Sequence, residues 1–439
     1  MTAPPETPIR VDLQLVAPRG DGAVDVSTRA GADARLDVGG VLPFADGAVR
    51  TLRAGDGLAT LSVRDRVQLL LECRRVLSPG GSLLLTEPGA RETRAALARW
   101  AALVGLIPLS ADAPSPGWHA QPRDPDPAPL VSIVIPSSNP RYFAECIDSA
   151  IAQTWRPIEI VVSDDSDADA IGALVHARAG RADIRYVKNP VRLKTRANYE
   201  QCVELARGEY IKFLNDDDVL EADCVATLVD AFVRVPGLTL ATSTRRRIDG
   251  DSRPLPDMPA TRPAVDRDLV VGGVSLANAT IMHGLNFIGE PSTALIRKRD
   301  FALRPDIDDD HRFSFNGEEV RGAVDFAMWS RVLVQGNAAF FARRLSRFRS
   351  HGEQAQANAE VVQRSIVGIR ALQRHWIELG LFRRWPPHLL QARDFEAAAS
   401  SAGAPWRLTP VLSVPLPAIA PGEAVTAWRA TKHHAFEPQ

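Results

Sequence analysis

Continuous apolar runs alternate with amphipathic stretches through the middle of the chain. The first run, LVSIVIP at Leu130–Pro136, is rich in β-branched residues and favours a strand buried on both faces. The same alternation predicts further strands at 157–162, 184–187 and 210–214, and helices at 141–153, 167–179 and 195–206. Strands that alternate with helices indicate a doubly wound α/β sheet. We therefore expect ligands at the carboxyl ends of the strands.

Proline marks the boundaries of this region. Six prolines fall within residues 114–129, and proline favours extended, solvated chain. A second proline-rich stretch, at 251–268, predicts a long mobile loop. The predicted division of the 439 residues is a small domain at 1–110, a Pro-rich linker at 111–129, a central domain at 130–351 and a C-terminal helical and irregular extension at 352–439.

Polar side chains follow three of the predicted strands. They are Ser137-Ser138-Asn139, Asp164-Asp165 and Asn215-Asp216-Asp217-Asp218. Three successive carboxylates repel one another and are costly to bury without a cation. A divalent metal with a bound diphosphate would balance them, because Mg²⁺ and Mn²⁺ prefer oxygen ligands. The alternative is a polar loop that caps the following helix.

Five segments, in order, resemble the motifs of family 2 glycosyltransferases. The segments are VSIVIPSSN from Val131, EIVVSDDSD at Glu159–Asp167, the stretch Ala197–Asp218, GEPSTALIRK at Gly289–Lys298 and VDFAMWSRVL at Val324–Leu333. The resemblance implies a GT-A nucleotide-sugar-binding fold. It also implies a metal-dependent, inverting transfer of a hexose-type sugar from a nucleotide-diphosphate donor to a bacterial glycan, lipid-linked or protein acceptor.

The resemblance also implies a set of donor-binding residues. Asp164 or Asp165 would accept a hydrogen bond from the nucleobase, whereas Lys194 and Arg196 would contact the diphosphate. The alternatives are a helix cap for the two aspartates and solvated positions for the two cations. The full set is Pro136, Ser137, Ser138, Asn139, Asp164, Asp165, Lys194, Arg196, Asn198, Asn215 and Asp216.

Asp217 matches the metal-binding final Asp of the family's Asp-x-Asp motif, whose first Asp is here Asn215. Asp216 and Asp218 stay open as alternative metal-binding carboxylates. His351 falls where some members of this fold bring a late histidine to the metal, although a surface histidine is the alternative. Imidazole suits Mn²⁺ better than Mg²⁺. The expected cofactor is therefore Mn²⁺ or Mg²⁺, bound by Asp217 and His351.

Inverting transfer needs a base that takes the proton of the acceptor hydroxyl. Asp325 matches the Asp of the family's Glu-Asp catalytic motif, with Val324 in place of the Glu. Glu318 and Glu319 are reserve candidates for the base. The alternative for Asp325 is a helix-capping role.

Residues 10–88 resemble the later part of a Rossmann-like, S-adenosylmethionine-dependent methyltransferase. LPFADGAV at 42–49 and ECRRVLSPGGSLLLTEP at 72–88 match that family, but LVAPRGDGAVDV lacks its Gly-rich turn. We expect a small, truncated and degenerate domain. Two other functions stay open: a bifunctional glycosyltransferase/methyltransferase, and a non-catalytic sugar-nucleotide-binding scaffold.

Composition narrows the possible partners. A hydrophobic content of 45%, a charged content of 24% and a net charge of −1 indicate a globular protein without a nucleic-acid partner. The four scattered cysteines are expected to be buried, in a reducing compartment. Without a signal peptide or an apolar run of ~18 residues, a cytoplasmic location is expected. Peripheral association with the inner membrane face stays open.

Overall fold

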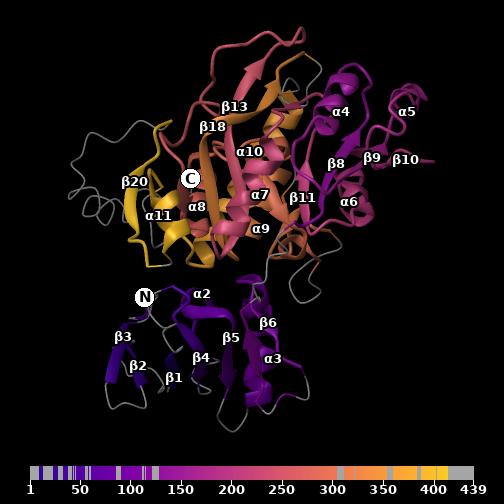
Figure 1. The fold of residues 1–439 in the computed structure, drawn as a ribbon. Coiled ribbons are helices and arrows are strands. Elements are labelled where there is room, and N and C mark those ends of the chain that lie inside the picture. The colour runs from indigo at the N-terminus through magenta and orange to yellow at the C-terminus, as the bar shows by residue number, and fades with distance from the viewer. Residues whose placement is uncertain are drawn as a thin grey trace, which may run out of the picture.

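The computed structural model contains two main β-sheets, one N-terminal and one much larger, and helices pack on both (Figure 1). Two small two-stranded sheets complete the described strands. The structure describes residues 9–12, 23–27, 33–37, 42–120 and 128–413, apart from 43, 45, 55–57, 59–60, 86–89, 111–112, 114, 304–310, 321, 353–358, 383–386 and 402.

The N-terminal sheet has five strands in the order β1-β4-β5-β7-β6. The first three are parallel, and β7 runs antiparallel to both of its neighbours. The elements of this region are β1 (Ile9–Asp12), β2 (Ala23–Ser27), β3 (Asp33–Asp37), β4 (Val49–Ala54), α2 (Val63–Val76), β5 (Leu77–Leu85), α3 (Ala90–Leu103), β6 (Ile107–Pro108) and β7 (Gly117–His119). β2 and β3 pair only with each other.

The predicted linker at 111–129 is wrong in part, because β7 lies inside it. Trp118, in the middle of β7, is fully buried, and its strand pairs with both β5 and β6. Pro116 lies directly before this three-residue strand, where it removes no hydrogen bond from the sheet. Residues 121–127 lie outside the described residues.

The large sheet has 11 strands in the order β10-β9-β8-β11-β15-β13-β18-β14-β19-β20, with β12 paired to β18 off this path. Its first four strands are parallel, as the alternation of strands and helices predicted. The elements of this half are β8 (Val131–Ser137), α4 (Phe143–Ile151), β9 (Ile158–Asp164), α5 (Ala170–His176), β10 (Ile184–Lys188), α6 (Lys194–Leu205), β11 (Tyr210–Phe213), β12 (Val219–Leu220) and α7 (Cys224–Arg234).

Helices cover both faces of the parallel strands. Ile133 and Ile135 of β8 pack in a core with α4, α5 and α7, whereas Val134 faces a second core that includes α6. Burial on both faces explains the uninterrupted apolar sequence of β8, because side chains alternate between the two sides of a strand. The predicted doubly wound α/β fold is confirmed for this half of the sheet.

The rest of the sheet is mixed. β13 and β18 run parallel to each other, whereas β15, β14, β19 and β20 pair antiparallel with their neighbours. The elements are β13 (Leu238–Ile248), β14 (Leu269–Val271), α8 (Gly273–His283), η1 (Pro291–Thr293), β15 (Leu295–Arg297), η2 (Lys298–Phe301), β16 (Ser314–Phe315), β17 (Glu318–Glu319), α9 (Val324–Leu333), β18 (Asn337–Arg349), α10 (Ala359–Glu378), β19 (Leu389–Asp394), α11 (Phe395–Ser400) and β20 (Arg407–Pro410).

The C-terminal extension belongs to the same structural unit as the central domain. Its strand β19 pairs with β14, and β20 pairs with β19, so the large sheet continues past the predicted boundary at residue 351. Helix α10 packs against α8, and its Trp376 is fully buried against Phe315 of β16. The predicted helix at 353–378 begins in this structure at Ala359, and residues 353–358 lie outside the described residues.

Two further predictions concern single segments. The proline-rich stretch at 251–268 has no helix or strand, but it is attached to the sheet rather than free: Arg344 forms an ion pair with Asp257 at 2.7 Å, and Arg247 donates to the carbonyl of Pro256. All four cysteines are buried and unpaired, as predicted. No helix among the described residues is long and apolar enough to cross a membrane.

We predict that Trp376→Ala destabilises the whole protein rather than a detachable tail. Removing this ring should lower the free energy of unfolding by about 3–5 kcal/mol, the usual cost of a large cavity. Val367→Ala on the same helix is the control: its side chain is 60% exposed, so a change within about 0.5 kcal/mol is expected. Urea denaturation of both variants measures the difference. Equal stabilities would show that α10 is not part of the core.

Candidate active site

A cavity of about 580 Å³ lies at the carboxyl ends of β8, β9 and β11. This is the edge of the sheet at which the sequence predicted a ligand. The predicted residues that line it are Pro136, Ser138, Asn139, Asp165, Lys194, Asn198, Asn215, Asp216, Asp217 and His351. Six lining residues were not predicted: Tyr142, Arg192, Thr195, Tyr199, Glu290 and Phe348.

Asp216 joins the loop after β8 to the acidic segment after β11. Its Oδ2 accepts hydrogen bonds from the Ser137 hydroxyl at 2.9 Å and from the backbone N–H groups of Ser138 at 2.8 Å and Asn139 at 2.9 Å. Burial and the nearby charge of Asp217 raise the pKa of Asp216, although these bonds act in the opposite direction. Asp216 and Ser137 thus fix the shape of the loop, and their predicted contact with the donor stays a prediction.

Asp218 is buried and fully used within the protein. Its carboxylate accepts hydrogen bonds from the Ser292 hydroxyl at 2.6 Å, from the side chain of Asn215 at 3.2 Å and from the backbone N–H of Arg349 at 3.0 Å. Burial, followed by the charges of Asp217 and Glu290, raises the pKa of Asp218 well above its usual range. These bonds occupy the Asp218 carboxylate within the protein, and its role as an alternative metal ligand stays a prediction.

Asp217 is the carboxylate that remains for a metal. It lines the cavity together with His351, whose Nε2 lies 3.0 Å from Asp217 Oδ2. Arg349 anchors the segment by donating from Nε to the Asp217 carbonyl at 2.7 Å. Among the described residues, no group of three or more His, Cys, Asp and Glu side chains could hold a metal ion. One carboxylate and one imidazole still fit a metal whose other ligands are diphosphate oxygens and water.

The two aspartates after β9 have different roles. Asp164 is fully buried, and its oxygens accept hydrogen bonds from Ser166, from the Tyr186 hydroxyl at 2.8 Å and from Lys188 at 3.2 Å. Asp164 does not line the cavity, whereas Asp165 does, so Asp165 is the better placed of the two for the predicted contact with the nucleobase, which stays a prediction. The partners of Asp164 on β10 hold it on the opposite side of the strand end from Asp165.

Asp165 lines the cavity and organises the start of α6. Its Oδ1 accepts from the N–H of Leu193 at 2.7 Å and from Asn189 at 3.0 Å, and its Oδ2 accepts from the N–H of Lys194 at 2.8 Å. Burial alone would raise the pKa of Asp165, but these hydrogen bonds outweigh it and hold the pKa below its usual value. The carboxylate is thus ionised, and Oδ2 keeps room for one further donor.

The cations at the mouth of the cavity differ from those predicted. Lys194 lines it and is exposed, with a left-handed backbone φ of 66° that its N–H bond to Asp165 supports. Arg196, one turn into the exposed side of α6, does not line the cavity, and Arg192 does so instead. The cavity therefore offers Arg192, rather than the predicted Arg196, as a possible contact for the diphosphate.

Asn198 has a structural role despite its place at the cavity wall. Its Nδ2 donates to the carbonyls of Ser137 at 3.3 Å and Ser163 at 3.2 Å, and its Oδ1 accepts from the Ser163 hydroxyl at 2.6 Å. The amide thus joins the ends of β8 and β9, which corrects its predicted contact with substrate. Asn215 likewise accepts a hydrogen bond from the Tyr199 hydroxyl and donates to Asp218.

Asp325 lies in the first turn of α9, away from the cavity wall. Its Oδ2 accepts a hydrogen bond from Asn286 at 2.6 Å, and Asn286 is itself fixed by two bonds to the backbone of Gly289. Burial, with a contribution from the charge of Glu290, raises the pKa of Asp325 to about 6. The side chains of the reserve candidates Glu318 and Glu319 lie outside the described residues.

Glu290 connects Asp325 to the cavity and was missed by the sequence analysis. It lines the cavity, and its charge contributes to the raised pKa values of both Asp325 and Asp218. Arg245, which is almost fully buried in β13, forms an ion pair with it at 2.6 Å. The sequence did contain a signal for this residue. Glu290 lies in the motif quoted at Gly289–Lys298 and is the only charged residue in its first part, GEPSTALI.

Comparison with known proteins assigns the class of this molecule. Residues 132–288 match the family model described as glycosyl transferase family 2. An uncharacterised protein of Mycobacterium tuberculosis is 30% identical over 225 residues, which are 50% of this chain and 66% of that protein. Chondroitin synthase of Escherichia coli is 35% identical over 123 residues, 28% of this chain and 18% of the synthase. The chain thus spans less than two thirds of either relative.

Two solved structures have a weaker likeness to the chain. TarS 1–349 of S. aureus in complex with UDP-GlcNAc is 15% identical with a TM-score of 0.42, covering 54% of this chain and 66% of that one. The mannosyltransferase PcManGT from Pyrobaculum calidifontis in complex with GDP-Man and Mn²⁺ is 14% identical with a TM-score of 0.41, covering 72% and 78%.

Residues 132–288 thus match a family 2 glycosyltransferase domain, and the α/β fold predicted from the motifs is the one observed. The family match begins at residue 132. The methyltransferase resemblance of residues 10–88 therefore gains no support from it and stays a prediction.

We predict that Glu290→Gln lowers the pKa of Asp325. The variant removes a negative charge that favours the protonated carboxyl, and it leaves the positive charge of Arg245 in place. NMR titration of Asp325 would detect the shift directly. Glu145→Gln is the control, because Glu145 is not among the groups that shift this pKa. An unchanged Asp325 titration in Glu290→Gln would show that the two carboxylates do not interact.

Proposed function

We propose that the protein is a metal-dependent, inverting glycosyltransferase that moves a hexose-type sugar from a nucleotide-diphosphate donor to a bacterial glycan, lipid-linked or protein acceptor. The observation that supports it most is the arrangement around the cavity at the strand ends. Asp217 and His351 lie together on its wall, and Lys194 and Arg192 also line it. The carboxyl of Asp325, whose pKa is raised in part by the charge of Glu290, lies outside this wall.

The donor would bind with its nucleoside over β8 and β9. Ser138, Asn139 and Pro136 line that side, and the free lone pair on Asp165 Oδ2 is suited to accept a hydrogen bond from a nucleobase N–H. Lys194 and Arg192 would contact the diphosphate, because exposed cations beside an ionised carboxylate can stabilise a polyanion without being buried.

Asp217 and His351 would hold Mn²⁺ or Mg²⁺. When bound, the metal neutralises the negative charge of the departing nucleoside diphosphate. The neighbouring carboxylates support this assignment by their own roles, since Asp216 and Asp218 are hydrogen-bonded within the protein and leave Asp217 to face the cavity.

Asp325 would take the proton of the acceptor hydroxyl as that oxygen attacks the anomeric carbon. A carboxylate with a pKa of about 6 is mostly ionised at neutral pH, yet it is more basic than an ordinary aspartate. Asn286 holds Oδ2 in position. Glu290 would provide the second carboxylate of the family's Glu-Asp motif, because Val324 stands in place of its Glu. Because the base must be deprotonated, turnover should rise with pH through about 6 and then level off.

Several finer assignments belong to the same proposal. Sugar transfer takes place in the cytoplasm, or at the inner membrane face with the protein attached there peripherally. Nucleic acid is not a partner. The N-terminal domain is degenerate and does not bind S-adenosylmethionine. Stoichiometric binding of that cofactor would favour the bifunctional alternative, and absence of nucleotide-sugar turnover with Mn²⁺ would favour the non-catalytic scaffold.

We predict that Asp217→Ala abolishes the Mn²⁺-dependent part of nucleoside-diphosphate binding. The change removes the carboxylate whose Oδ2 lies 3.0 Å from His351 Nε2, so addition of EDTA should no longer alter the affinity. Calorimetric titration with and without EDTA measures this. Asp230→Ala on the exposed side of α7 should behave as the unmodified protein does. If EDTA leaves the affinity of the unmodified protein unchanged, the metal assignment is wrong.

We predict that Asp325→Asn lowers turnover by roughly 10²–10⁴-fold, the usual contribution of a general base. The amide keeps the shape of the carboxylate but cannot accept the proton of the acceptor. Donor affinity should stay nearly constant, because Asp325 does not line the donor cavity. Initial rates and donor titrations test both statements. Glu318→Gln and Glu319→Gln are the comparison variants, and loss of turnover in either of them, with Asp325→Asn active, would reassign the base.

A further inference from the structure

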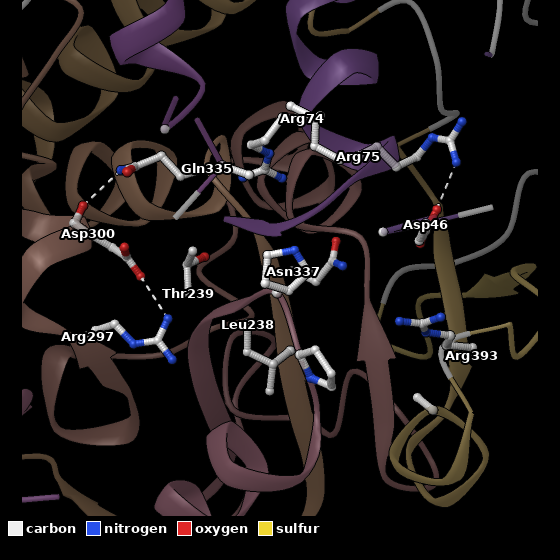
Figure 2. A pocket seen from close by; sticks show the side chains of 18 of the residues that line it. Asp46, Arg74, Arg75, Leu238, Thr239, Arg297, Asp300, Gln335, Asn337 and Arg393 are labelled. Carbon is white, nitrogen blue, oxygen red and sulfur yellow. Dashed lines mark hydrogen bonds and ion pairs between the residues drawn. The ribbon is translucent and has the colours of Figure 1, made fainter. Parts of the chain in front are cut away.

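A second cavity, of about 270 Å³, lies between the N-terminal sheet and the glycosyltransferase domain (Figure 2). The two parts are in close contact around it. Arg64 donates to the carbonyl of Ile377 at 3.0 Å, Gln68 donates to the carbonyl of Gly380 at 3.1 Å, and one hydrophobic core extends across the junction. The cavity is thus a defined space within the protein and lies apart from the proposed donor site.

Five arginines and two aspartates line this cavity, a formal charge of +3. The arginines come from both sides of the junction: Arg74 and Arg75 from α2, Arg297 and Arg299 from the segment β15–η2, and Arg393 from β19. Cations that line one cavity repel one another unless acidic groups or a bound anion balance them.

Three of the arginines have acidic partners within the protein. Arg75 forms ion pairs with Asp46 at 2.9 Å and Glu72 at 2.8 Å, and Arg297 lies 3.7 Å from Glu209 and 3.8 Å from Asp300. Arg299 Nε lies 4.0 Å from Asp300 Oδ1. Glu72 and Glu209, which stand behind the lining residues, thus lower the formal charge around the cavity from +3 to +1.

Arg74 differs from its neighbour on the same helix. Figure 2 shows its side chain extending from α2 towards Thr239 and Asn337, whereas Arg75 turns away to Asp46. Arg74 makes no hydrogen bond and no ion pair within 4.0 Å with any part of the chain that the structure describes. Burial lowers the pKa of its guanidinium to about 10, and the more distant Asp300 and Asp46 offset this only in part.

The remaining wall supplies fixed donors. Arg393 stacks on the Trp406 ring at 4.5 Å, which holds its guanidinium at the cavity. Asn337 lines the cavity between Arg74 and Arg393, and its side-chain amide has no partner in the described part of the chain. Guanidinium groups bind phosphate through paired N–H donors, and an amide can add another.

We propose that this cavity binds a small molecule through a phosphate group, with Arg74, Arg393 and Asn337 as its main contacts. A phosphate monoester carries about −1.5 to −2 charges at neutral pH, and its several oxygens can accept the N–H donors of two guanidinium groups and an amide at once. The ligand would contact both the N-terminal domain and the glycosyltransferase domain. Its binding would therefore stabilise their junction.

Calorimetric titration of the full chain tests the proposal, with glucose 1-phosphate, inorganic phosphate and glucose as separate probes. EDTA is present throughout, so that no divalent metal can bring phosphate to the donor site, and ionic strength is held constant with chloride. We expect one molecule of a phosphate-bearing probe per chain and no binding of glucose. Comparison of the two phosphate probes distinguishes a phosphorylated metabolite from the free ion.

Two variants and two controls locate the binding. Arg74→Gln should weaken binding at least tenfold, and so should Asn337→Asp, which adds a negative charge without removing an arginine. Arg91→Gln, on the exposed side of α3, and Asp217→Ala should leave it unchanged. Three results would overturn the proposal. Both Arg74→Gln and Asn337→Asp could bind the phosphate probe as tightly as the unmodified protein, Asp217→Ala could lose binding, or the unmodified protein could fail to bind either phosphate probe.

Thermal melting without ligand separates this role from a purely structural one. Arg74 lies in the last turn of α2, where a cation can stabilise a helix end. If that were its function, Arg74→Gln would melt at a lower temperature than the unmodified protein. We expect instead an unchanged or higher melting temperature, because the variant removes a charge that burial opposes. A clear loss of stability in Arg74→Gln would contradict the proposal.

Discussion

Repulsion among three successive carboxylates at the end of β11 determines how the rest of the site is built. Each charge is balanced by a different segment: the loop after β8 surrounds Asp216, and Ser292 of η1 together with the backbone of β18 binds Asp218. The η1 segment is in turn held by Lys212, a fully buried lysine of β11 whose Nζ donates to the Ser292 carbonyl. Asp217 is left facing the cavity because its two neighbours are satisfied elsewhere.

The parallel half of the fold could be predicted closely from sequence. The strand predicted at 184–187 is observed at Ile184–Lys188, and the one at 210–214 is observed at Tyr210–Phe213. Inner strands such as Tyr210–Phe213 are buried on both faces, so their apolar runs are continuous and easily recognised, whereas the edge strand Ile184–Lys188 is only partly buried. The mixed half could not be predicted in the same way. The parallel pairing of β13 with β18 joins segments almost a hundred residues apart, and nothing in either strand alone specifies its partner.

Some site residues could be placed from the sequence around them, whereas others depend on contacts with distant segments. The sequence placed Asp217, His351 and Asp165 where the structure has them at the cavity. It could not separate Asp165 from Asp164, because adjacent residues at a strand end point to opposite sides, and the side of each depends on Tyr186 and Lys188 from the next strand. Glu290 was missed because its importance comes from Asp325 and Arg245, which are distant in sequence.

The position of His351 directly after β18 has a consequence for synthesis of the protein on the ribosome. Its partner Asp217 follows β11, so 134 residues separate the two side chains that would hold a metal. The parallel strands around Asp217 can pair as soon as they leave the ribosomal tunnel, whereas the metal-binding pair cannot form until β18 has been translated and has joined the sheet. A nascent chain that stalls before residue 351 would therefore have most of a nucleotide-binding fold but only half of the metal site.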